Sequence, residues 1–264
     1  MKVSFSKKII AYTIAFLSVL FAVLLVVLPK EEISENENRY LASFPKLTKE
    51  SFFGGDYMAD IEIYINDHFP FRDTIVGIKS QVDRAIGKKD FNDVYLGQDG
   101  FLIQAYDGYD LSLQEKHAII IEDFAKAADV KTYVILTPTS NAVYANQKPP
   151  HCYDADQIAD IEHFYQLFNT AVPVNVHTSL LENHDDALLY FKQDHHWNTN
   201  GAYLAYADFC GCLGLAPIAV NQFSVQTVSD DFYGTYYSLS KLYTLPPDTI
   251  QIYQPQFERD LTVS

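Results

Sequence analysis

The chain has 264 residues, of which 48% are hydrophobic and 14% aromatic, so it can form one globular domain plus an attachment segment and is not a disordered chain. The formal net charge is −15, and without the three lysines of residues 1–8 the remainder carries −15 − 3 = −18. Such an acidic surface repels nucleic acid and anionic headgroups, which excludes nucleic acid as a partner.

An uncharged apolar stretch comes first along the chain. Residues 9–28 carry no charge, and at a helical rise of ~1.5 Å per residue they can span a bilayer. Lysines lie before this stretch and glutamates cluster after it, which predicts a single-pass anchor in the cell membrane with residues 1–8 in the cytoplasm. A cleaved signal peptide is the alternative, but the stretch is longer than a typical h-region and no A-x-A precedes Pro29.

The sequence after the anchor predicts two parts outside the cell. Residues 29–56 are expected to form an extended, polar juxtamembrane segment, and residues 57–264 the extracellular domain. Residues 57–87 are typical of two helices that are broken at Pro70 and end at Gly87.

The rest of the domain alternates between strand and helix patterns. A hairpin is expected over 94–103, around Asp99-Gly100. Strands are expected over 131–136, 172–176 and 187–191, and helices over 112–128, 156–169, from 178, and over 201–213. Ser112 and Glu115 fit a capping box, and Asn198 or Thr199 caps the last helix. This alternation predicts an α/β fold with a parallel sheet that is covered by helices on both faces.

The three cysteines carry little information. Cys152 could form a disulfide outside the cell, whereas Cys210 and Cys212 lie at the end of a predicted helix, where a buried thiol is the commoner role. Two neighbouring cysteines do not make a structural zinc site.

Polar residues follow two of the predicted strands, at the edge where open α/β sheets place their sites. Residues 137–141 follow the first of these strands, and the segment Asp194-His195-His196-Trp197 follows the last. In an extended segment Asp194 and His196 share one side and His195 points away. A carboxylate beside an imidazole fixes its tautomer, which is the orienting half of a Ser–His–Asp relay.

Two other interpretations of this cluster stay open. A metal site needs at least a third ligand, and no histidine spacing supports one, so we predict no metal. The two histidines could also be structural residues that cap the following helix.

Several segments of the chain carry a resemblance to a known family. They are ENENRYLASFPKLT (35–48), FFGGDYMADIEIYINDHFPFRD (52–73), VYLGQDGFLI (94–103), TPTSNAVYANQKPP (137–150), KQDHHWNTNGAY (192–203) and DFYGTYYS (231–238). In these segments the chain resembles the DHHW family, which is similar to the SGNH-hydrolase-like alginate O-acetyltransferases.

The resemblance implies an SGNH-hydrolase-like fold and a role for each residue of the motif. Asp194 would orient His196, and His196 would act as general base, next to Trp197. The relatives move acetyl groups onto exopolysaccharide outside the membrane, so the implied partners are a cell-surface polysaccharide and a membrane-bound O-acyltransferase that supplies the acetyl group. We predict no cofactor.

A relay also needs a nucleophile. In the relatives the serine comes after the Asp-x-His, but the 67 residues after Trp197 contain no serine in a strand–turn–helix context. We therefore expect a C-terminally truncated domain. It would be inactive if the family segment that carries the catalytic serine is absent. Ser140, at the end of the strand over 131–136, is the alternative nucleophile.

Three further residues are candidates for substrate binding. Asn141 could donate to an oxyanion, Trp197 is either a platform for a sugar ring or a packing anchor, and His195 lies beside the motif's base. The sequence leaves two functions open. One is an O-acetyltransferase or esterase for cell-surface polysaccharide, and the other is a non-catalytic anchored domain that binds glycan or a partner.

Overall fold

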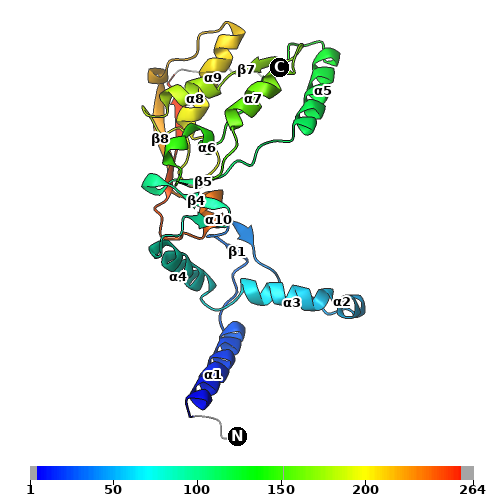
Figure 1. The fold of residues 1–264 in the computed structure, drawn as a ribbon, viewed down its shortest axis with the longest axis vertical. Coiled ribbons are helices and arrows are strands. Elements are labelled where there is room, and N and C mark those ends of the chain that lie inside the picture. Colours follow the sequence, from blue (N-terminus) through cyan, green and yellow to red (C-terminus); the bar gives the residue numbers. More distant parts are fainter. Residues whose placement is uncertain (1–4, 151, 257–264) are drawn as a thin grey trace. The chain divides into compact units, whose positions relative to one another are not determined.

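The computed structural model describes residues 5–150 and 152–256. The chain divides into two compact units, Met1–Ala85 and Ile86–Ser264. In Figure 1 the first unit runs from blue to teal, and the second from teal through green and yellow to red.

The first unit begins with the apolar helix. Helix α1 spans Phe5–Val27, and its stretch Ser6–Val27 has a mean hydropathy of 2.8 with no buried side chains. It is long and apolar enough to cross a membrane, and a signal sequence near an N-terminus has the same properties.

The remainder of the first unit consists of helices and one short strand pair, joined by irregular segments. Its elements are β1 (Ile33–Ser34), β2 (Arg39–Tyr40), α2 (Lys49–Gly54), α3 (Asp56–Asp67) and α4 (Arg72–Ala85). The break between α3 and α4 at Pro70 is as predicted. The expectation of an extended segment over 29–56 is wrong for α2, because the side chains of Thr48 and Ser51 cap that helix reciprocally.

An ion-pair network holds β2 against the end of α3. The guanidinium of Arg39 donates to both carboxylate oxygens of Asp67, at 3.0 and 2.6 Å, and the backbone N–H of Ala42 donates to the same carboxylate at 2.8 Å. The hydrogen bond from Arg39 is the main reason why the pKa of Asp67 falls to about 2.

Within its described residues, the second unit contains three separate small sheets. A three-stranded antiparallel sheet consists of β3 (Asp90–Phe91), β4 (Val94–Leu96) and β5 (Leu102–Gln104). A parallel pair consists of β6 (Tyr133–Ile135) and β7 (Val172–Val174), and an antiparallel pair of β8 (Phe223–Phe232) and β9 (Asp248–Pro255). The predicted hairpin is confirmed as β4 and β5, with the 3₁₀ turn η1 (Gln98–Gly100) between them.

The predicted parallel sheet is present only as the β6–β7 pair in the part of the chain that is described. The expectation of a strand over 187–191 is wrong, since that segment forms only an isolated bridge between Tyr190 and Trp197. The reason is local: the carbonyls of Leu188 and Leu189 accept hydrogen bonds from Asn198, at 2.7 and 2.8 Å, and so serve the start of the next helix.

The helices α5, α7, α8 and α9 of the second unit lie close to their predicted positions, whereas α6 and α10 are not among the predicted helices. They are α5 (Leu111–Ala127), α6 (Ser140–Val143), α7 (Gln157–Gln166), α8 (His177–Asn183), α9 (Thr199–Leu213) and α10 (Thr235–Ser240), with 3₁₀ turns η2 (Ala145–Gln147) and η3 (Val220–Gln222). Asn198 caps α9 as predicted. The capping box at Ser112 is wrong, because the side chain of Asp110 accepts from the N–H groups of Ser112 and Leu113 instead.

Three apolar clusters form the core of the second unit. The first joins β5, β7 and α8 to α9 through residues such as Ile103, Val174 and Leu180. The second packs Tyr236 and Tyr237 of α10 on the β3–β4–β5 sheet, so these tyrosines are core residues. The third joins α5 and α7, which lie side by side in Figure 1.

All three cysteines are free in the structure. Cys152 is half-buried, Cys210 is buried in α9 and Cys212 is exposed. The burial of Cys210 agrees with the packing role that its position at the end of a helix predicts.

Candidate active site

The candidate site is a tight turn over residues 191–197 rather than an extended segment. The turn begins beside β5, since the N–H of Leu102 donates to the carbonyl of Lys192 at 2.8 Å. Its centre is buried: Gln193 is 2% and Asp194 3% exposed. The turn therefore fixes one carboxylate inside the fold and leaves the next residues at the surface.

The carboxylate of Asp194 is fully engaged by hydrogen bonds. Oδ1 accepts from the backbone N–H of His196 at 2.9 Å and from its Nδ1 at 2.5 Å. Oδ2 accepts from the backbone N–H of Thr235, the first residue of α10, at 2.7 Å. Burial by itself raises the pKa of Asp194, but these donors outweigh it and hold the pKa below its ordinary value.

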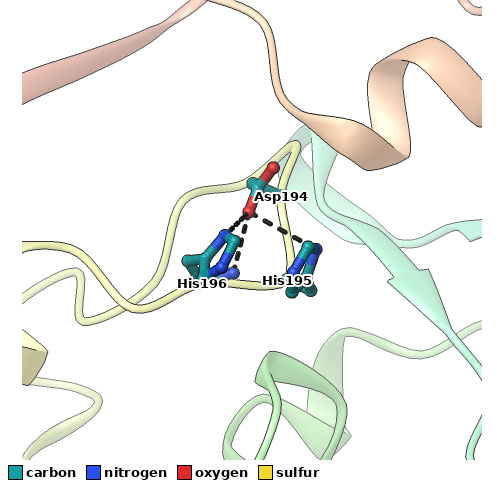
Figure 2. A group of neighbouring side chains, drawn as sticks. All are labelled: Asp194, His195 and His196. Atoms are coloured by element: carbon teal, nitrogen blue, oxygen red, sulfur yellow. Dashed lines mark hydrogen bonds and ion pairs between the residues drawn. The ribbon is translucent and has the colours of Figure 1, made fainter.

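This geometry fixes the tautomer of His196. A carboxylate can only accept, so Nδ1 carries the proton and Nε2 keeps its lone pair. The side chain of His196 is 68% exposed, and Figure 2 shows its ring held at the Asp194 carboxylate. The pair thus presents an oriented base to the surface.

The expectation that His195 points away is wrong. Its Nδ1 lies 3.5 Å from Asp194 Oδ1, and its ring centroid is 3.8 Å from that of His196. Figure 2 shows both imidazoles on the same side of the carboxylate. The reason is that the backbone turns sharply here, so the alternation of an extended strand does not apply.

The turn is anchored by two segments that follow it in the sequence. The carbonyl of Gln193 accepts from the N–H groups of Tyr236 and Tyr237 at 3.0 and 3.2 Å. The N–H of Gln193 donates to the carboxylate of Asp248, at the start of β9, at 2.9 Å. Burial raises the pKa of Asp248, and its carboxylate anchors the turn through this hydrogen bond.

Gly234 allows α10 to approach the carboxylate. A Cβ atom at this position would lie 2.5 Å from both Cβ and Oδ2 of Asp194 and 2.6 Å from the carbonyl oxygen of Gln193. No side chain fits in that space. The glycine is therefore required for the hydrogen bond between Thr235 and Asp194.

The ligand atoms of Asp194, His195 and His196 all lie within 4.8 Å of one another, which meets the minimum number of ligands for a metal ion. Two ligands on a tetrahedral zinc ion at ~2.1 Å would be roughly 3.4 Å apart. Asp194 Oδ1 and His196 Nδ1 are 2.5 Å apart, so this arrangement is that of a hydrogen-bonded pair.

Comparisons with known proteins identify the family. Residues 86–263 match the family model described as DHHW protein. The chain belongs to the DHHW family. The match covers the second unit, including the DHHW motif of residues 194–197 and the α10 segment that holds it.

Solved structures are similar to this DHHW chain, and those with a TM-score above 0.5 share its fold. A DHHW family protein from Eubacterium siraeum is 24% identical with a TM-score of 0.55, over 63% of this chain and 55% of that chain. PatB1 from Bacillus cereus is 20% identical with a TM-score of 0.51, over 62% of this chain and 58% of that chain. The O-acetyltransferase domain of AlgJ from Pseudomonas putida is 18% identical with a TM-score of 0.46, over 61% of this chain and 65% of that chain.

The chain thus spans a little over half the length of the first two of these structures, 55% and 58%. No curated protein matches the sequence.

Trp197 of the DHHW motif packs inward. It is half-buried, forms the bridge with Tyr190 and contacts the core cluster of β5, β7, α8 and α9. A Cβ on Gly201 would lie 2.9 Å from Cβ of Trp197, so the first turn of α9 closes over the tryptophan. These contacts are those of a packing anchor, one of the two roles expected for this residue.

Ser140 and Asn141, at the start of α6, are buried, with exposures of 0% and 1%. The amide of Asn141 donates to Asp154 at 2.7 Å, and the hydroxyl of Ser140 has no hydrogen-bond partner among the described residues. No hydrogen bond joins Ser140 to His196 in the part of the chain that is described. The structure therefore links Asp194 and His196, and leaves these two residues inside the α6 turn.

Gly234, Thr235, Gln193 and Asp248 are site residues that motif reasoning does not find. The only signal for the first two is the segment DFYGTYYS, which resembles a family block without revealing its role. Asp248 lies 54 residues beyond Asp194 in a sequence without any motif.

Proposed function

We propose that this DHHW protein is an O-acetyltransferase or esterase-type protein that acts on cell-surface polysaccharide. The observation that carries the proposal is the 2.5 Å hydrogen bond from Nδ1 of His196 to Oδ1 of the buried Asp194. It leaves Nε2 as the basic nitrogen on a largely exposed side chain. The resemblance of Asp194, His196 and Trp197 to the Asp-x-His-Trp motif of alginate O-acetyltransferases supports this chemistry.

In the proposed step, Nε2 of His196 takes the proton of a hydroxyl group as its oxygen attacks the carbonyl carbon of an acyl ester. The ester bond to the leaving oxygen breaks, and the imidazolium returns the proton to that oxygen. Asp194 stabilises the imidazolium and keeps its Nδ1–H oriented. The acyl group ends on the attacking oxygen, so protons and bonds balance.

The hydroxyl in the proposal is that of a serine in a covalent route, or that of the acceptor sugar in a direct one. Ser140 does not fit the role of that serine in this conformation, because it is fully buried and has no hydrogen bond to His196. We therefore assign the base and its orienting carboxylate, and no nucleophile among residues 5–150 and 152–256.

The cellular setting of the proposal rests on α1. We propose that this helix anchors the protein in the cell membrane, with the N-terminus inside and the DHHW unit outside. Its length, its apolarity and the lysines that precede it support this topology. A membrane-bound O-acyltransferase is the proposed acyl supplier. We also propose that the parallel β6–β7 pair belongs to an SGNH-like sheet.

A second function is an anchored domain that binds glycan or a partner without catalysis. It is favoured by one observation, the lack of a serine that is hydrogen-bonded to His196 among the described residues.

The test uses the full chain in detergent, with p-nitrophenyl acetate as acyl donor. We expect hydrolysis or transfer that His196→Ala reduces to background, while His163→Ala, a half-buried histidine of α7 without a side-chain hydrogen bond among the described residues, leaves it unchanged. Both variants should melt at similar temperatures. Equal activity in wild type and His196→Ala would overturn the proposal, and a wild type without activity would favour the non-catalytic function.

A further inference from the structure

A cavity separate from the DHHW turn lies between α5 and α7, beyond the carboxyl end of β6. Its volume is about 260 Å³, and it is open to solvent. The lining residues used here are Tyr106, Tyr109, Gln114, His117, Asp160 and Phe164. The carboxyl end of a parallel strand is where open α/β folds place ligands, so this position is itself informative.

Asp160 is the charged group of the cavity, and it is held in a fixed orientation. Its Oδ2 accepts from the hydroxyl of Tyr106 at 2.7 Å and from the backbone N–H of Tyr109 at 3.2 Å. Burial raises the pKa of Tyr106, so its hydroxyl keeps the proton that it donates. Oδ1 of Asp160 has no hydrogen-bond partner in the described part of the chain and can accept from a ligand.

The cavity also has a buried amide in its wall. Gln114 is 4% exposed, and its Nε2 lies 3.5 Å from the carbonyl oxygen of Asp160. A carbonyl oxygen only accepts, which assigns the nitrogen to that side and leaves Oε1 as a buried acceptor without a partner among the described residues. Phe164 adds an apolar side chain to the lining.

An aromatic ring stands at the edge of the same cavity. Tyr109 is 40% exposed, and its hydroxyl lies 2.9 Å from Nδ1 of His117. The contact orients the tyrosine side chain, and two-fifths of the residue stays accessible. The lining of the cavity thus combines an aromatic ring, an apolar side chain and an acceptor oxygen.

We propose that this cavity binds one neutral pyranose unit of a glycan. Pyranose rings pair an apolar C–H face with hydroxyl donors, which matches the Tyr109 ring in the same lining as the acceptor oxygen Oδ1 of Asp160. A uronate is disfavoured, because its carboxylate would meet Asp160 in a chain of net charge −15. The inference deepens the proposed function, on which it rests for a glycan as the class of ligand.

A short series of contacts connects this cavity to the DHHW turn. Thr137 lines the cavity, and the next residue, Pro138, accepts a hydrogen bond on its carbonyl from the hydroxyl of Tyr190. Tyr190 forms the bridge with Trp197, which directly follows His196. A sugar in the cavity therefore lies on the same framework that carries the proposed base.

The test measures sugar binding by the full chain with ligand-observed NMR, in a detergent that contains no sugar headgroup. The probes are glucose, galactose and N-acetylglucosamine as neutral pyranoses, and glucuronate as the anionic one. We expect at least one neutral probe to bind and glucuronate to bind more weakly. Tyr109→Ala and Asp160→Asn should each weaken binding about tenfold, the loss expected for an aromatic contact or a charge-assisted hydrogen bond.

Asp186→Asn is the matched control for Asp160→Asn, because it makes the same charge change at an exposed residue outside the cavity. Tyr109→Ala supplies the second variant if Asp160→Asn disturbs the fold. The inference is overturned if no neutral probe binds, if glucuronate binds best, or if Tyr109→Ala binds as wild type does.

The outcome is separable from that of the proposed acyl transfer. Sugar binding that depends on Tyr109, without any acyl transfer, overturns the base assignment alone. Acyl transfer that depends on His196, without sugar binding in the cavity, overturns the cavity assignment alone.

Discussion

Asp194 and Glu122 are carboxylates with nearly the same burial, with exposures of 3% and 5%, yet one belongs to the candidate site and the other has a structural role. Both accept hydrogen bonds from backbone N–H groups that lie far away in the sequence: Thr235 for Asp194, and residues 169–171 for Glu122. Only Asp194 also accepts from an exposed imidazole, that of His196. Glu122 also pairs with an exposed group, the ammonium of Lys126 at 3.8 Å. The comparison therefore teaches that a buried, hydrogen-bonded carboxylate by itself marks structure, and that the exposed imidazole of His196 is what marks Asp194 as a candidate site.

The largest expected effect is that of Asp194→Asn. The amide has one acceptor oxygen where the carboxylate has two, so it cannot serve both His196 and Thr235, and the imidazole loses the partner that fixes its tautomer. We expect acyl-transfer activity to fall by about 10⁴-fold, measured as the initial rate with p-nitrophenyl acetate. A variant that keeps wild-type activity would exclude Asp194 as the orienting residue.

Gly234→Ala should have the next largest effect, because it tests the packing that holds Asp194. The new Cβ would lie 2.5 Å from Cβ and Oδ2 of Asp194, so α10 or the carboxylate must move. A displacement of about 1 Å can reduce a rate by about 100-fold, and we expect a loss of that order.

The control for this prediction is Gly211→Ala in α9, where nothing lies within 4 Å of the added Cβ. Alanine in a helix interior is favoured over glycine by about 0.5–1 kcal/mol, so this variant should melt at a slightly higher temperature with unchanged activity. Equal activities of the two glycine variants would contradict the role assigned to Gly234.

Glu122→Gln tests whether the second carboxylate of the comparison, Glu122, acts on stability alone. The neutral amide accepts more weakly from the N–H groups of Asn169, Thr170 and Ala171, which lie 2.9–3.0 Å from Oε1. We expect the melting temperature to fall by roughly 5 °C, followed by circular dichroism, with no change in acyl-transfer activity. Glu115→Gln, at an exposed position of the same helix, should change neither quantity. Loss of activity in Glu122→Gln without loss of stability would contradict the purely structural role assigned to Glu122.

The sequence predicts most of the local structure because its signals are local. Asp99-Gly100 between apolar runs predicts the β4–β5 hairpin, and Asn198 predicts the start of α9. The segment over 187–191 has the apolar composition of a strand, but its carbonyls bond to Asn198, a choice that composition does not reveal. The hydrogen bonds to Asn198 therefore override the apolar pattern in the segment that precedes the motif.

Within the site, too, features that depend on neighbouring residues are predictable and features that depend on the folded chain are not. The pairing of Asp194 with His196 follows from adjacent residues and is predictable, whereas the position of His195 depends on a tight turn that alternation does not describe. Gly234 and Asp248 reach the turn only through the folded chain, about 40 and 54 residues later. Sequence thus identifies the chemical pair and leaves the residues that hold it to the structure.

The smallest expected effect is a difference in acid sensitivity between wild type and Glu122→Gln. Burial by itself raises the pKa of Glu122, but the N–H groups of residues 169–171 lower it to about 2, against about 4.3 in an unfolded chain. A lowered folded-state pKa means that the unfolded chain binds the proton more tightly, so this contribution to stability is full above the unfolded value. It is lost as the pH falls from about 4.3 through about 2. We expect the difference in melting temperature between wild type and Glu122→Gln to shrink over that range, and a difference that grows on acidification would mean that the carboxylate is not held as the structure describes.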